Sequence, residues 1–145
     1  MRLISGRFMF NLVIASVGAV VLLTAGSALA HHSFAAEYDA KRLVTLPQAT
    51  VTRVEWVNPH SWIHIEVKNK DGAVEKWMIE GNTPNTLARR GISRDTLKVG
   101  TVISIVGYQA KDGSLRASGR DLTYPDGRKV LMASAGAGAP PDETK

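Results

Sequence analysis

The sequence predicts a small all-β domain with one short helix, arranged as an OB-fold-like five-stranded Greek-key barrel. Three observations lead to this fold class. Segments rich in β-branched and aromatic residues recur along residues 49–132, one of them alternates between apolar and polar side chains, and a single helix-start signal separates the third segment from the fourth. The resulting order, β-β-β-α-β-β, is that of a partly open OB barrel.

Each expected strand is bounded by turn residues. The second strand gives the clearest signal, because Ile63, Ile65 and Val67 alternate with polar side chains. Asp71-Gly72 is a hairpin turn signal, so the third strand follows it directly. The expected strands are Ala49–Val57, Ser61–Asn69, Val74–Glu80, Thr101–Tyr108 and Leu115–Tyr124, followed by a sixth short run at Arg128–Met132.

Between the third and fourth strands we expect one short helix, since Thr83 is a suitable cap, Pro84 suits the first helical position and Gly91 is a suitable end. The fourth strand is apolar on both faces, as expected for a central strand. Gly119 in the fifth strand suggests a bulge.

The pairing of the second and third strands can be derived from the turn. A three-residue loop at residues 70–72 sets Asn69 opposite Ala73. The opposed pairs are then Ile65 with Trp77 and Ile63 with Ile79 in the core, and His64 with Met78 and Glu66 with Lys76 on the other face. A slip by one residue would mix the two faces. Six residues are expected in the core: Ile63, Ile65, Trp77, Ile79, Ile103 and Ile105.

Residues 1–30 are predicted to be a cleaved secretory signal peptide. Arg2 and Arg7 give a basic start, an apolar run follows, and Ala28-Leu29-Ala30 is an A-x-A cleavage site. The apolar run is short for a membrane anchor, which needs about 20 residues. We therefore expect export to the periplasm, with no membrane attachment after cleavage. Residues 31–48 are expected to form an N-terminal arm, residues 49–132 the barrel, and residues 133–145 a disordered tail.

Composition limits the possible functions. The chain has 18 basic and 13 acidic residues, and only Arg2 and Arg7 among them lie in the predicted signal, so the remainder carries a net charge of about +3. This excess is too small to indicate a nucleic-acid partner, and export also argues against one. The absence of cysteine excludes thiolate metal sites, thiol redox chemistry and disulfides.

The four histidines fall into two tight groups, which suggests a transition-metal site. His31 and His32 follow the cleavage site, and His60 and His64 flank Trp62 in the segment WVNPHSWIH. After cleavage, the α-amine and imidazole of His31 could chelate Cu(II) in a histidine brace, and cleavage one residue earlier would give another Cu(II)-binding terminus. Met78 adds a thioether opposite His64, and imidazole with thioether favours copper.

Other interpretations stay open. The histidines could be ordinary solvated or turn residues. The chain could instead be a ligand or protein-interaction module without metal, in which Trp56, Asn58 and Trp62 form the binding surface and Arg53 and Lys76 supply charge. A histidine-brace oxygen enzyme is a further alternative. A non-enzymatic binding domain is the interpretation that we expect, since no carboxylate pair, nucleophile–base set or phosphate loop is recognisable.

Two motifs carry a family resemblance. HHSF at residues 31–34 and the segment Trp56–His60 (W-x-N-P-H), together with Gly100 before the fourth strand and Trp77 in the third, resemble a family of small exported proteobacterial proteins of unknown function. The resemblance implies export and directs attention to the histidines and Asn58. The expected barrel and histidine patch are also similar, by residue type, to periplasmic OB-fold copper carriers, which use more than one methionine where this chain offers Met78.

Overall fold

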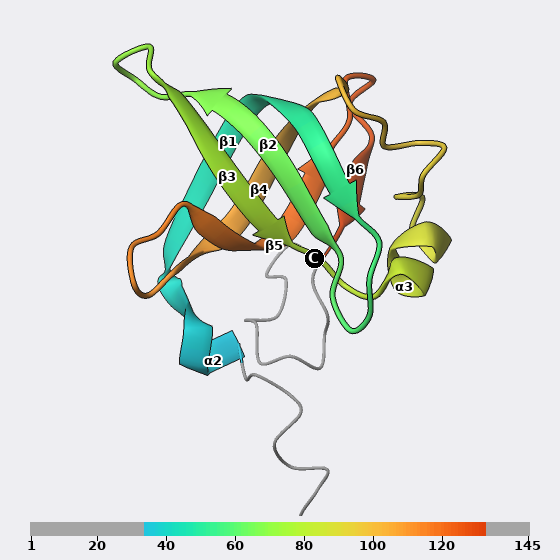
Figure 1. Cartoon of the computed structure of the whole chain (residues 1–145), viewed down its shortest axis with the longest axis horizontal. Coiled ribbons are helices and arrows are strands. Elements are labelled where there is room, and N and C mark those ends of the chain that lie inside the picture. The colour runs from blue at the N-terminus through green and yellow to red at the C-terminus, as the bar shows by residue number, and fades with distance from the viewer. Residues whose placement is uncertain (1–33, 133–145) are drawn as a thin grey trace, which may run out of the picture. The chain divides into compact units, whose positions relative to one another are not determined.

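A computed structural model describes residues 34–132, in which six strands and two short helices form the barrel of Figure 1. The strands are β1 (Tyr38–Glu55), β2 (Trp62–Lys68), β3 (Val74–Glu80), β4 (Val102–Ala110), β5 (Arg116–Thr123) and β6 (Lys129–Leu131), and the helices are α2 (Phe34–Glu37) and α3 (Pro84–Arg89). The predicted signal peptide, His31, His32 and the predicted tail lie outside the described residues. Neither α2 nor α3 has the length and apolar character needed to cross a membrane.

Five of the strands close into a ring. Strand β1 pairs antiparallel with β2 on one side and with β4 on the other, β2 pairs with β3, and β4 with β5. A short parallel pairing between β3 and β5 completes the circuit, and β6 extends the sheet beyond β5. The predicted all-β barrel, with β-β-β-α-β-β order around a short helix, is confirmed. Helix α2 is an additional single turn ahead of the barrel.

The first strand is longer than the sequence indicated. It starts at Tyr38 instead of Ala49, so residues 38–48, expected in an arm, belong to the strand and pair with β4 at Tyr38 and from Leu43 to Leu46. The hydrophobic pattern of the sequence does not indicate this part of the strand, because its residues between Tyr38 and Leu46 are mostly exposed and give little apolar alternation. An irregularity between Leu46 and Ala49, where Gln48 has a φ of 52°, interrupts the pattern further.

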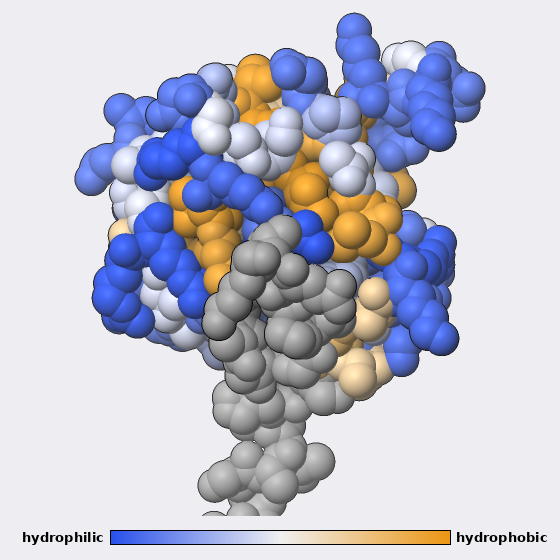
Figure 2. All heavy atoms as spheres, turned by 180° about the vertical axis from the view of Figure 1, so that it is seen from behind, coloured by the Kyte–Doolittle hydropathy of each residue, from blue (hydrophilic) through white to orange (hydrophobic). Residues whose placement is uncertain are grey.

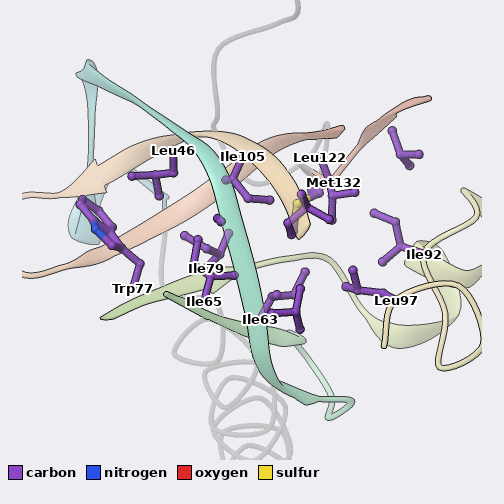
Figure 3. Close-up of a cluster of buried hydrophobic side chains, with 14 of the residues drawn as sticks. Leu46, Ile63, Ile65, Trp77, Ile79, Ile92, Leu97, Ile105, Leu122 and Met132 are labelled. Carbon is purple, nitrogen blue, oxygen red and sulfur yellow. The ribbon is translucent and has the colours of Figure 1, made fainter. Parts of the chain in front are cut away.

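The core lies inside the ring. All six predicted core residues are at most 5% exposed, which confirms the assignment of strand faces. Figure 3 shows Leu46 and Trp77 toward one end of this core and Ile92 and Leu97, which follow α3, toward the other. Helix α3 begins as predicted, since the Thr83 hydroxyl accepts a hydrogen bond from the Thr86 amide, and it contributes the buried Leu87. The barrel therefore has one continuous apolar interior, and the residues of α3 and of the segment that follows it cover one end.

A second, smaller cluster lies apart from this interior. It consists of Phe34, Tyr38, Tyr108 and Ala110. The Phe34 ring centroid is 5.7 Å from that of Tyr38 and 5.3 Å from that of Tyr108, and the latter contact is edge-to-face. Figure 2 shows the molecule from behind, relative to Figure 1, and on this face exposed apolar side chains lie between hydrophilic ones. The small cluster fixes α2 and the start of β1 to β4.

Candidate functional site

The outward-facing side chains of β2 and β3 include three residues that the sequence singled out, namely Trp62, His64 and Met78. The predicted register is confirmed at each pair: Ile63 with Ile79, Ile65 with Trp77, His64 with Met78, and Glu66 with Lys76. Trp62 lies opposite Glu80 on β3 and opposite Glu55 on β1. The outer face therefore presents one tryptophan between two carboxylate residues, with a histidine two positions away on either side along the chain.

Glu80 joins His60 to the start of β1. One carboxylate oxygen, Oε1, contacts Nδ1 of His60, and the other, Oε2, accepts a hydrogen bond from the Tyr38 hydroxyl. The Glu80 side chain is only 14% exposed, whereas that of His60 is 36% exposed. An ionised carboxylate only accepts hydrogen bonds, so Nδ1 of His60 carries the proton. In the neutral ring, Nε2 is then the nitrogen with a free lone pair.

The environment of Tyr38 keeps its hydroxyl protonated. Burial raises the pKa of Tyr38 well above its ordinary value of about 10, and the hydrogen bond to Glu80 raises it further. Arg116, whose guanidinium carbon lies 5.7 Å from the Tyr38 ring centroid, opposes this shift without reversing it. Tyr38 is therefore a permanent hydrogen-bond donor that holds the Glu80 carboxylate in place.

His64 contacts a different carboxylate, that of Glu55. Its Nε2 lies 2.8 Å from Oε1 of Glu55, which also accepts from Nη2 of Arg53 at 3.0 Å. The His64 side chain is 21% exposed, and Met78 opposite it is 39% exposed. Because Glu55 and Glu80 lie on opposite sides of Trp62, the two histidines are turned toward different strands. The structure brings together His60, Glu80 and Tyr38 as one set, and His64, Glu55 and Met78 as another.

Trp56 and Asn58 are placed differently from Trp62. Trp56 is partly buried and packs against the main core, with the Arg94 guanidinium carbon 5.8 Å from its ring centroid. Asn58 is exposed in the loop after β1, where it precedes Pro59 through a cis peptide bond. Trp56 and Trp62 therefore do not lie on one common face.

Comparison with known families places this arrangement in context. The model of a family of unknown function (DUF6152) matches residues 19–119, which is more than half of the chain. The chain belongs to this family. The matched DUF6152 range contains both histidine groups and all the residues of the two sets described above. No curated protein and no solved structure matches the chain.

Within residues 34–132, this DUF6152 member has no group of three or more His, Asp and Glu side chains gathered so that it could hold a metal ion. In each of the two sets, the second ring nitrogen of the histidine has no hydrogen-bond partner among residues 34–132. A carboxylate that binds one ring nitrogen of a histidine fixes the tautomer and the ring orientation, as is common around metal-ligating histidines. The described part of the DUF6152 chain can thus supply oriented single ligands.

The sequence did not single out Glu80, Glu55 or Tyr38 as functional. Glu80 could have been found, because the predicted register sets it opposite Trp62 and beside the His64–Met78 pair on the polar face. The contact of Tyr38 with Glu80 spans 42 residues of chain and depends on a part of β1 that carries no clear strand pattern. No local signal predicts it.

Proposed function

We propose that this protein is an exported, non-enzymatic periplasmic domain that binds a transition-metal ion, copper in particular, through histidine nitrogens. The observation that carries the proposal is the set of Tyr38, Glu80 and His60. A histidine held through one nitrogen by a carboxylate, which is itself held by a buried tyrosine, has the second-sphere support typical of a metal ligand.

One imidazole is not enough for a tight site, and the sequence offers further nitrogen ligands at the predicted mature N-terminus. Cleavage after Ala30 would give His31 a free α-amine beside its own imidazole, with His32 next in the chain. Both histidines precede Phe34 by only two or three residues, which is about 10 Å of extended chain at most. We propose that His31, or His31 with His32, joins His60 around one ion.

Copper is favoured by ligand type. Imidazole and amine nitrogens suit Cu(II), which lies at the top of the affinity order for divalent first-row metals. In this proposal His64 and Met78 lie outside the site, because His64 is oriented by Glu55 and stands on the other side of Trp62 from Glu80. His64 therefore provides a matched control of the same residue type, four residues further along the chain.

The test is a Cu(II) titration of protein recovered from the periplasm of expressing cells, where intact mass should show a chain that begins at His31. We expect His60→Ala and His31→Ala each to weaken binding by at least tenfold, and His64→Ala to leave it within about threefold. Glu80→Gln should weaken binding by roughly 10–100-fold, the effect usual for second-sphere partners. If His60→Ala binds copper as tightly as the wild type, the barrel contributes no ligand and the proposal is wrong.

A further inference from the structure

A cavity of about 540 Å³ lies between the middle of β1, the end of β2 and the start of β3, beside the hairpin that projects at the upper left of Figure 1. This volume is within the range of about 300–1,000 Å³ that is usual for small-molecule sites. Pro47, Val67 and Val74 supply apolar lining. Tyr38, His60 and Glu80, the described residues of the copper proposal, are not among those that line it.

Four polar side chains also line the cavity: Gln48, Thr50, Glu66 and Lys68. Glu66 and Lys68 lie on the same face of β2, two residues and therefore about 6.6 Å apart along the strand. Thr50 on β1 lies opposite Glu66, and Val74 on β3 lies opposite Lys68. The cavity thus presents a negative and a positive group a short distance apart above an apolar wall.

These charges are only weakly engaged within the protein. The Glu66 carboxylate is 3.5 Å from the Lys76 ammonium, but the Lys76 side chain is 82% exposed and that of Glu66 is 41% exposed. An ion pair so exposed to water contributes little. Lys68 forms no ion pair with any of residues 34–132 and is exposed. Both groups can therefore bind a charged ligand with little loss of existing contacts.

The backbone at the rim supports a binding role. Gln48 adopts a φ of 52°, which is uncommon for a residue other than glycine, at the irregularity between Leu46 and Ala49. Such conformations carry a cost and are found preferentially at ligand sites, where the surrounding structure holds them in place. Here the unusual backbone sets a residue with both an amide donor and an amide acceptor at the cavity wall.

We propose that this cavity binds a small zwitterion, namely a free amino acid or a dipeptide, with its ammonium group at Glu66 and its carboxylate at Lys68. A polyanion would be repelled by Glu66 and a simple cation by Lys68, whereas a molecule that carries both charges matches both side chains. Gln48 and Thr50 can hydrogen-bond a peptide or carboxylate group, and the apolar wall can cover a small side chain. The inference is independent of copper binding.

The test is a titration of the ¹⁵N-labelled protein with L-alanyl-L-alanine and with L-leucine, followed by amide chemical shifts. We expect saturable shifts for residues 48–50, 66–68 and 74 with at least one of the two probes. Glu66→Gln and Lys68→Gln should each weaken binding by about tenfold or more, since each removes a charge-assisted hydrogen bond. Lys70→Gln, in the same hairpin but outside the cavity lining, is the control and should bind like the wild type.

The charge requirement is tested with blocked probes. N-acetyl-L-alanyl-L-alanine lacks the ammonium group and L-alanyl-L-alaninamide lacks the carboxylate, so both should bind about tenfold more weakly than the unblocked dipeptide. The inference is overturned if neither unblocked probe gives saturable shifts, if the blocked probes bind equally well, or if both cavity variants bind like Lys70→Gln. A circular dichroism spectrum for each variant confirms that loss of binding is not loss of folding.

Discussion

Tyr38 connects the start of β1 to the candidate site. Its ring packs in the small aromatic cluster beside Phe34, and its hydroxyl donates to the carboxylate that holds His60. A hydrogen bond to a charged group contributes more than a neutral one, about 1.5–3 kcal/mol. Tyr38 therefore both stabilises the fold and restricts the position of Glu80.

We expect Tyr38→Phe to lower the free energy of unfolding and to change its dependence on pH. The folded protein holds the phenol proton more tightly than the unfolded chain, so this group stabilises the fold fully below pH about 10 and loses its contribution as the pH rises further. In urea unfolding, the free energy of unfolding should fall more between pH 8 and pH 11 for the wild type than for Tyr38→Phe. Equal losses would mean that other groups account for the alkaline instability.

Among the elements, the β2–β3 hairpin could be predicted fully from the sequence. Its turn, its strict alternation and its apolar pairs all specify one register, and a slip by one residue would expose Ile63 and Ile65. Strand β1 could be predicted only in its second half. Its first half is paired through the backbone to β4 while most of its side chains face solvent, so composition contains little information about it.

The assigned faces of β2 can be tested by a pair of substitutions on this hairpin. Ile65 is 1% exposed in the core, so Ile65→Ala should cost about 2–5 kcal/mol of unfolding free energy. Lys76, on the outer face, is 82% exposed, and Lys76→Ala should change stability by about 0.5 kcal/mol or less. Equal, small effects in urea unfolding would contradict the packing of the barrel interior.

The candidate site could be predicted in part, because the local register of the β2–β3 hairpin positions some of its residues. The position of His64 opposite Met78 follows from local register, as does that of Trp62 on the outer face. The separation of His60 from His64 does not, because it depends on which carboxylate each ring meets, and these come from strands on opposite sides of β2. The cavity lined by Gln48 depends on an irregular β1 backbone, for which the sequence offers only Pro47 as a hint.

At the scale of the whole molecule, the ring is closed by only a short parallel pairing, in which Met78, Ile79 and Glu80 of β3 meet Arg116, Ala117 and Ser118 of β5. The candidate site lies at this closure, since Glu80 is one of the paired residues. The close approach leaves no room at Gly119, where an added Cβ would lie 2.9 Å from a methyl of Ile79. Packing between β3 and β5 thus links the position of Glu80 to the closure of the barrel.

The last described residues also pack against β5, and truncation should show where the folded unit ends. Met132 is fully buried, its amide donates to the Arg120 carbonyl at 2.8 Å, and its side chain reaches Gly119. Val130 on β6 is also buried, and Lys129 pairs with the buried Asp121 at 3.3 Å.

A chain that ends after Ala133 retains all these contacts, so its unfolding free energy should stay within about 0.5 kcal/mol of the wild type. A chain that ends after Gly127 loses β6 and Met132, and should be less stable by several kcal/mol, since truncation of one buried methionine alone costs about 2–5 kcal/mol. Urea unfolding of both chains decides the matter: if the shorter chain is as stable as the longer one, β6 is not part of the cooperative unit, and if both are equally destabilised, the folded unit extends beyond residue 133.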